Sequence, residues 1–205
     1  MTRLDNELCS IEIELVEIEP DEKELDEKEL DDTYWSGDDY NRDYDIILDP
    51  DGYLHKDCRI AYDIRIKMPG REYSVALVGH ICCKDNDCAV LEGEILTILH
   101  CFDVVQFNVM TAQIVKTAPV DDYPNFSIYR VRDGYLVHGE LDITMLNDDL
   151  DKVWSFGGRD IFVSPDGGKA FRIGEDRIYL YDFDNNYYEI DFQGREIKAV
   201  MHDSK

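Results

Sequence analysis

The sequence is poor in basic residues. It has 21 lysines and arginines against 46 aspartates and glutamates among 205 residues, a formal net charge of −25 at pH 7. Nucleic-acid affinity comes largely from Lys and Arg neutralising phosphates, so this balance argues against a nucleic-acid partner. Anionic membrane surfaces are disfavoured for the same reason. A basic protein or divalent cations would be attracted, while the alternative is that the charge serves solubility alone.

Targeting signals are also missing. The first 20 residues contain no basic segment followed by a continuous apolar one, and no apolar run is long enough to cross a membrane. We therefore expect a cytoplasmic protein. The cysteines lack the regular spacing of a secreted disulfide framework, and in a reducing compartment we expect free thiols. They are Cys9, Cys58, Cys82, Cys83, Cys88 and Cys101.

Signatures of catalysis are absent too. The chain has no G-x-S-x-G, no P-loop and no G-x-G-x-x-G that opens a helix. The residue types of a zinc or cysteine site do occur between residues 80 and 101, and a metal-dependent or cysteine-based hydrolase that uses this region is the alternative function. However, there is no C-x-x-C pair, and adjacent Cys82 and Cys83 would point to opposite faces of a strand. We expect structural thiols, with no cofactor. The residues concerned are His80, Cys82, Cys83, Cys88, His100 and Cys101.

Alternating and β-branched segments fill the N-terminal half. Residues 10–18 alternate apolar side chains with glutamates, and residues 44–48 form a short strand candidate. Residues 59–68 and 73–83, joined by Pro69-Gly70, predict a hairpin. Residues 88–102 fit a helix or strands, and Gly93 with the β-branched content favours strands.

The C-terminal quarter predicts a meander of short strands. The candidates are residues 160–164, 169–173, 177–183, 187–192 and 195–200, which are rich in aromatic and β-branched residues. Gly, Asn and Asp separate them because these residues tolerate the positive φ of tight hairpins.

Two motifs in this quarter suggest more specific structures. Ser164-Pro165-Asp166-Gly167, followed by residues 178–182 (IYLYD), resembles one blade of a WD40 or TolB-type β-propeller. The resemblance covers about forty residues and implies a local four-stranded meander; a single S-P-D-G does not imply a whole propeller. Asp182, Asp184 and Asn186 match the first three oxygen positions of an EF-hand loop. Tyr187 and Gln193 stand where Gly and Glu are needed, so a hairpin turn is favoured over a calcium site.

Together these patterns predict a mainly β protein with antiparallel, meander-type sheets and at most one or two short helices. The sheets would form one sandwich or two packed lobes. The lobes would be residues 1–118, with an acidic loop at 19–45, and residues 119–205, the C-terminal meander. The division rests on the proline-containing polar segment that begins near residue 117.

The predicted function is that of a non-enzymatic module that binds a basic protein, as an inhibitor, an immunity-type protein or an adaptor. An accessory structural domain is a further alternative. The expected binding face is an acidic stretch with interleaved aromatic residues, which could hold Arg and Lys by charge pairing and cation–π contacts. An equal alternative is that these aromatic residues anchor the loop to the core. The residues are Asp31, Asp32, Tyr34, Trp35, Asp38, Asp39, Tyr40, Asp43 and Tyr44.

Overall fold

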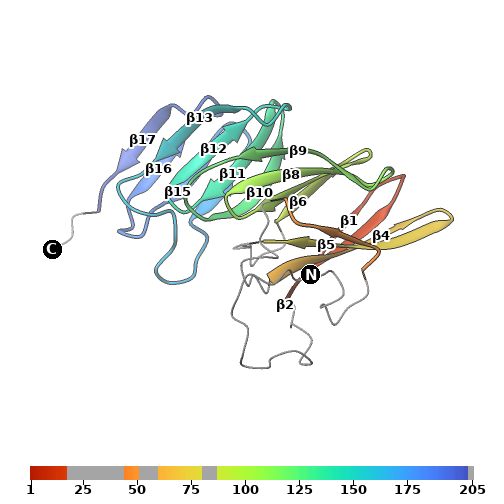
Figure 1. The fold of residues 1–205 in the computed structure, drawn as a ribbon. Coiled ribbons are helices and arrows are strands. Elements are labelled where there is room, and N and C mark those ends of the chain that lie inside the picture. Colours follow the sequence, from red (N-terminus) through yellow and green to blue (C-terminus); the bar gives the residue numbers. More distant parts are fainter. Residues whose placement is uncertain (18–43, 51–59, 80–86, 203–205) are drawn as a thin grey trace, which may run out of the picture.

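The strands of the molecule form four sheets that follow one another in a row (Figure 1). The computed structural model describes residues 1–17, 44–50, 60–79 and 87–202, and over these residues it has seventeen strands and no helix. The predicted mainly β, antiparallel fold is confirmed. In the described ranges there is accordingly no helix that is long and apolar enough to cross a membrane.

The first sheet, here called the N-terminal sheet, has five strands in the order β1-β2-β4-β5-β3. They are β1 (Thr2–Asp5), β2 (Ser10–Glu17), β3 (Ile46–Leu48), β4 (Ile60–Met68) and β5 (Arg71–Val78). The predicted hairpin is β4–β5, and Gly70 has the positive φ of 77° that its turn needs. β3 pairs with β5 in parallel, which the sequence did not predict.

The other three sheets are antiparallel meanders of four consecutive strands. The second sheet contains β6 (Ala89–Glu92), β7 (Ile95–His100), β8 (Asp103–Asn108) and β9 (Gln113–Pro119). The third contains β10 (Asn125–Val131), β11 (Gly134–Gly139), β12 (Asp142–Leu146) and β13 (Lys152–Gly157). The C-terminal sheet contains β14 (Phe171–Ile173), β15 (Ile178–Tyr181), β16 (Tyr187–Ile190) and β17 (Glu196–Val200). The strand interpretation of residues 88–102 is therefore confirmed, with Gly93 in the turn at φ 56°.

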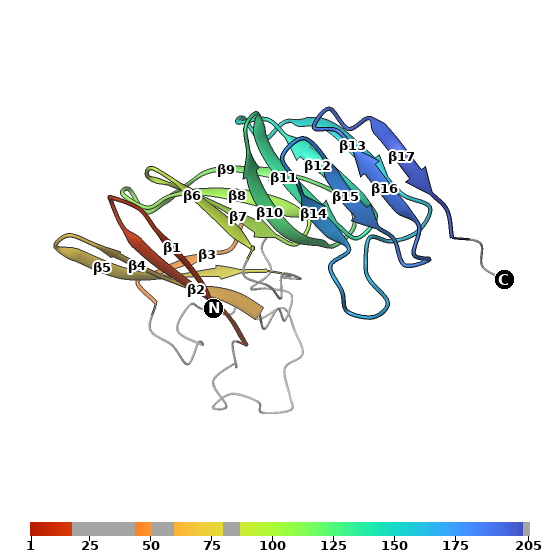
Figure 2. The same cartoon turned by 180° about the vertical axis from the view of Figure 1, so that it is seen from behind.

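The resemblance to a propeller blade predicted one four-stranded meander, and β14–β17 form it. Two more sheets share its topology, although neither has the S-P-D-G turn. Four-stranded meanders are the unit of β-propellers, which use typically four to eight of them around a channel. Here the four described sheets form an open row, with the N-terminal sheet at one end and the C-terminal sheet at the other (Figures 1 and 2).

The prediction of a strand at residues 160–164 is wrong. This segment connects two sheets: the Phe162 amide donates to the carbonyl of Glu140 at 2.7 Å, and the Phe183 amide donates to that of Ile161 at 2.8 Å. The Phe162 ring is fully buried in the core beneath. A segment whose backbone bonds go singly to two partners cannot form a ladder, even though its composition is typical of a strand.

Two hydrophobic clusters hold the row together. The larger one joins the N-terminal and second sheets and reaches the third through Ile128, Tyr135 and Val137. The other fills the space between the third and C-terminal sheets. The predicted boundary after residue 118 falls at the end of β9, between the second and third sheets. The division into two lobes stays a prediction.

Each junction between sheets also has specific contacts. His100 Nε2 lies 2.8 Å from the Val78 carbonyl, which links the second sheet to the N-terminal sheet. At the other end, the Trp154 indole donates to the Phe192 carbonyl at 3.1 Å, and the His138 ring stacks on Phe171 with centroids 4.9 Å apart.

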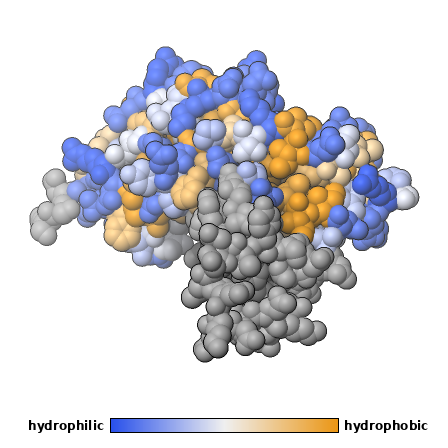
Figure 3. All heavy atoms as spheres, in the orientation of Figure 1, coloured by the Kyte–Doolittle hydropathy of each residue, from blue (hydrophilic) through white to orange (hydrophobic). Residues whose placement is uncertain are grey.

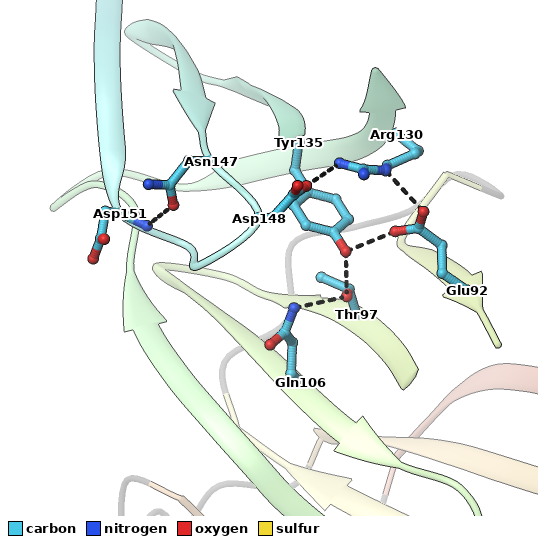
Figure 4. A network of polar contacts seen from close by, with 8 residues as sticks. All are labelled: Glu92, Thr97, Gln106, Arg130, Tyr135, Asn147, Asp148 and Asp151. Atoms are coloured by element: carbon cyan, nitrogen blue, oxygen red, sulfur yellow. Dashed lines mark hydrogen bonds and ion pairs between the residues drawn. The ribbon is translucent and has the colours of Figure 1, made fainter. Parts of the chain in front are cut away.

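A polar network joins the second and third sheets (Figure 4). The Arg130 guanidinium donates to Glu92 at 2.8 Å and to Asp148 at 2.6 Å, while the Tyr135 hydroxyl donates to Glu92 at 2.8 Å. Thr97 donates to the same hydroxyl at 3.3 Å. Burial raises the pKa of Tyr135, so the phenol stays a neutral donor. Each of these side chains has a hydrogen-bond partner within the network. We therefore interpret the network as a structural junction between the two sheets.

Candidate functional site

The face of the N-terminal sheet that points away from the second sheet carries both acidic and basic side chains. Strand alternation turns Ile11, Ile64 and Val75 inward to the core, so their sequence neighbours point outward. We call this surface the N-terminal outer face. Its acidic side chains are Asp5, Glu12, Glu14, Asp45, Asp63 and Glu72, and its basic ones are Arg3, Arg65 and Lys67.

An open concavity of about 500 Å³ lies on this face. That volume is in the range of small-ligand or side-chain pockets. Three carboxylates and one guanidinium lie in its lining, so the balance of charge favours a cationic guest. The lining residues are Tyr44, Asp45, Asp63, Arg65, Glu72, Tyr73 and Ser74.

Asp45 is held in place by Ser74. The Ser74 amide donates to Asp45 Oδ2 at 2.7 Å, and its hydroxyl donates to the same oxygen at 3.1 Å. In return the Asp45 amide donates to Ser74 Oγ at 3.2 Å. The hydrogen bonds from Ser74 lower the pKa of Asp45, so this carboxylate is charged at neutral pH. The chain thus fixes a negative charge where β3 begins.

Asp63 and Arg65 are second neighbours on β4 and point to the same side. Asp63 is almost fully buried, while the side chain of Arg65 is 63% exposed and its Nη2 lies 3.3 Å from Asp63 Oδ2. The hydrogen bond from Arg65 to Asp63 raises the pKa of the guanidinium. Glu72 on β5 is 66% exposed and lies 3.7 Å from Lys67. Because the side chains of Arg65 and Glu72 are so exposed, their ion pairs are weak, and either side chain can exchange its present ion pair for one with a binding partner at a small cost in free energy.

The Tyr73 ring points away from the concavity, to the inner side of the sheet beside its partner Ile66 in the core. Its hydroxyl donates to the Val109 carbonyl of the segment that follows β8, and the Arg71 guanidinium carbon lies 4.4 Å from its ring centroid. Burial raises the pKa of Tyr73 to about 12. The phenol is therefore neutral at physiological pH and acts as a packing group.

Of the predicted binding residues, only Tyr44 lies in the described part of the chain, and it lines the concavity. It also packs against the buried cluster of Ala61, Ala76 and Val78. The other eight, from Asp31 to Asp43, lie outside the described residues. Sequence reasoning missed Asp63 and Glu72, although the predicted alternation of residues 59–68 already placed Asp63 and Arg65 on the polar side.

The cysteine and histidine cluster of the alternative function is described only in part. His80, Cys82 and Cys83 lie outside the described residues. Cys88 is a buried free thiol 3.5 Å from Thr2 Oγ1, and Cys101 is a buried free thiol too. Cys9 is also free, so the prediction of free thiols is confirmed for these three. Among the described residues, no group of three or more His, Cys, Asp or Glu could hold a metal ion.

The EF-hand-like residues form a turn, as predicted. The buried Asp182 carboxylate accepts from the Asn186 amide at 2.8 Å, from the Asn186 side chain at 2.9 Å and from the Tyr188 hydroxyl at 2.9 Å. Burial alone would raise the pKa of Asp182, but these hydrogen bonds outweigh it and lower the pKa. With its oxygens directed to these donors, Asp182 organises the β15–β16 hairpin.

At the other end of the row, the C-terminal sheet presents a second polar face, here called the C-terminal outer face. Ile178, Leu180 and Ile190 point inward to the core, and their neighbours point outward. One row across the strands contains Arg172, Tyr179, Glu189 and Lys198, and the next contains Tyr181, Tyr187 and Val200.

This face combines tyrosines with ion-paired basic residues. The Arg172 guanidinium carbon lies 4.0 Å from the Tyr179 ring centroid, and the Tyr181 and Tyr187 rings lie 5.0 Å apart. Arg177 Nη1 donates to Glu189 at 2.6 Å, and this hydrogen bond is the main cause that lowers the pKa of Glu189. Glu189 is thus neutralised within the face, and Arg177 also pairs with Asp176 at 3.5 Å. Figure 3 shows hydrophilic and hydrophobic residues mixed on the C-terminal flank, at the left of the view.

Comparison with known proteins identifies no relative by sequence. No family model matches the chain, and no curated protein matches it. Among solved structures, the computationally designed Ika8 protein has 8% identity and a TM-score of 0.49 over 71% of this chain and 47% of that one. BamB from Moraxella catarrhalis has 11% identity and a TM-score of 0.45 over the same shares. The dihydro-heme d1 dehydrogenase NirN has 10% identity and a TM-score of 0.47 over 69% and 35%. The chain thus spans less than half of each, and likenesses at these scores carry no argument about function.

Proposed function

We propose that this chain is a non-enzymatic, cytoplasmic module that binds a basic protein. The observation that supports it best is the acidic concavity on the N-terminal outer face, which adjoins Tyr44 at the end of the acidic–aromatic stretch. Carboxylates beside the Tyr44 side chain suit an arginine or lysine side chain, because the guest gains both charge pairing and a ring contact.

The overall charge supports the same proposal. A net charge of −25 accelerates encounter with a basic protein, and the concavity then supplies the local contact that net charge alone cannot. An inhibitor or immunity-type protein that covers a cationic active site would use both.

The experiment must separate the concavity from the general charge. A fluorescent peptide that contains two arginines would be titrated into the full chain at about 150 mM salt, where charges more than ~8 Å apart are largely screened. The test variant carries Asp45→Asn with Glu72→Lys. The control variant carries Asp184→Asn with Glu94→Lys, two exposed acids that do not line the concavity, and has the same change in net charge.

We expect the test variant to bind about tenfold more weakly and the control variant to bind like the wild type. Circular dichroism and thermal unfolding of each variant check the fold. Equal losses of peptide affinity in both variants would show that net charge alone causes the binding, and would overturn the proposal for this concavity. Reversal of four acids between Asp31 and Asp45 to lysine tests the rest of the predicted stretch in the same assay.

A further inference from the structure

The last strand of each four-stranded meander is an open edge. β9, β13 and β17 each have one neighbouring strand in their sheet, and in the described part of the chain no backbone group bonds to their other side. All three lie toward the same rim of the molecule, at the top of Figures 1 and 2. A row of unpaired amide and carbonyl groups is a template on which a strand of another molecule can add. The molecule therefore presents three such templates along one rim.

Each of these edge strands has the same irregularity near its start, where one extra residue shifts the register. In the third sheet, Leu146 pairs with Lys152. The residue before it, Met145, pairs with Trp154, which leaves Val153 without a partner in β12. This is the pattern of a β-bulge, which bends the strand and increases its twist. The extra residues are all β-branched and at least half exposed, and they are Val115, Val153 and Ile197.

The turn before each bulge is repeated as well. In each turn the side chain of an Asn or Asp accepts hydrogen bonds from backbone amides of the same turn, and these residues are Asn108, Asn147 and Asp191. A residue with positive φ follows, and the bulged residue comes three positions after it. The positive-φ residues are Ala112 at 59°, Leu150 at 58° and Gly194 at 74°. Three successive sheets thus share one turn and one bulge, so the bulge belongs to the repeated unit.

A lysine lies beside each bulged residue. The pairs are Val115-Lys116, Lys152-Val153 and Ile197-Lys198. The side chains of Lys116 and Lys198 are 40% and 55% exposed, and Lys152 is exposed too. Lysine on an edge strand opposes strand addition, because a strand that covers the edge would take the ammonium group out of water. Bulges and lysines are two means by which natural sheets protect their edges, and here they coincide at one place in all three sheets.

From this coincidence we infer that the bulge and its lysine form a protective device, which keeps the outer edges of β9, β13 and β17 from pairing with strands of other molecules. The bulge interrupts the regular ladder that an added strand needs, and the lysine places a charge at the same point. The device concerns the rim of the meanders, whereas the proposed function concerns the N-terminal sheet, so the two proposals are independent.

Deletion of a bulged residue tests the inference without a change of register. In a chain that lacks Val153, the pairs Leu146–Lys152 and Met145–Trp154 become consecutive rungs of a regular ladder. The test variant combines this deletion with Lys152→Thr, which removes the charge and introduces a residue that favours strands. The control variant is Val153→Ala, which keeps the bulge and the lysine but removes the exposed apolar side chain.

Sedimentation velocity and amide hydrogen exchange are the readouts, at up to roughly 100 μM protein and about 150 mM salt. We expect the test variant to associate, and the β13 amides that do not bond to β12 to exchange at least about tenfold more slowly in the associated species. In the wild type and the control variant these amides should exchange at the same rate at all protein concentrations. A test variant that stays monomeric, or that associates without slower exchange in β13, would overturn the inference.

A second variant guards against a failure to fold, which circular dichroism would detect. Deletion of Ile197 with Lys198→Thr repeats the experiment on β17. There the pairs Ile190–Glu196 and Glu189–Lys198 become consecutive. We expect the same association, with slower exchange of the β17 amides that do not bond to β16. A folded, monomeric variant of this kind would contradict the protective role of the bulge as directly as the first one.

Discussion

The imidazole of His100 lies where a side chain on Gly79 would have to be. A Cβ atom at residue 79 would be 1.9 Å from His100 Nε2. The same nitrogen lies 2.8 Å from the Val78 carbonyl, so the second sheet docks on the N-terminal sheet at a point where only glycine leaves room.

Substitution of Gly79 therefore tests this junction. We expect Gly79→Ala to lower the free energy of unfolding by about 2 kcal/mol, because the methyl group forces the two sheets apart. In the double variant with His100→Ala the clash is absent. The double variant should therefore lose less free energy of unfolding than the sum of the losses in the two single variants. Urea unfolding of the four proteins measures the coupling. Strict additivity would show that His100 does not set the spacing.

The junction between the third and C-terminal sheets has a similar close approach. Gly194 has φ 74°, and a Cβ there would lie 2.6 Å from the Trp154 ring. Gly167 has the same φ but nothing within 4 Å, so it is a matched control. We expect Gly167→Ala to cost about 1 kcal/mol from backbone strain alone, and Gly194→Ala to cost about 1–3 kcal/mol more from the clash. Urea unfolding measures both, and tryptophan fluorescence should shift only in the second variant. Equal costs would contradict the close contact.

Asp182 should contribute stability that depends on pH. Its pKa is lowered in the folded protein, so the contribution is complete above the unfolded value of about 3.9 and is lost as the pH falls toward the folded value. At pH 7 we expect Asp182→Asn to lose about 2 kcal/mol, the scale of hydrogen bonds to a buried charged group. The gap between the wild type and the variant should shrink below about pH 4. Denaturant unfolding across pH 3–7 tests this, with exposed Asp184→Asn as the control. A gap that is independent of pH would refute the assignment.

The Arg130 network should couple the second and third sheets modestly. The side chain of Arg130 is 32% exposed and that of Glu92 is 43% exposed, so water screens the pair. We expect Arg130→Met to cost about 1 kcal/mol and its coupling with Glu92→Gln to be about 0.5 kcal/mol. The cost should fall at high salt. A coupling near zero would mean that the Arg130–Glu92 ion pair adds nothing to the junction.

The sequence predicted the strands where apolar and polar side chains alternate, and where a turn residue fixes the position of a hairpin. β4 and β5 follow from Ile64, Ile66 and the turn at Gly70, and the β15–β16 hairpin follows from Asp182 and Asn186. The prediction failed where the structure of a segment depends on hydrogen-bond partners far away in the sequence. Phe162 belongs to a strand-like run, yet its backbone bonds go to Glu140, which no local pattern reveals.

Of the residues that line the concavity, the sequence predicted only Tyr44 as a binding residue. Tyr44 was included because aromatic and acidic residues gather before it. Glu72 was not, because its place beside Asp45 depends on the parallel pairing of β3 with β5, and a three-residue strand carries too little pattern to reveal its partner. The C-terminal outer face was hidden for another reason. Its charges are spread over four strands and assemble only in the register of the folded sheet.

The row of sheets also implies how the molecule comes apart. The C-terminal sheet shares its hydrophobic cluster with the third sheet and the Phe162 segment, and with neither of the first two sheets. Stability in such a chain resembles a sum of local terms and nearest-neighbour interfaces, as in repeat proteins. The last sheet can therefore open as a unit while the larger cluster stays closed. Any partner that covers its outer face would raise the free energy of that opening without touching the rest of the fold.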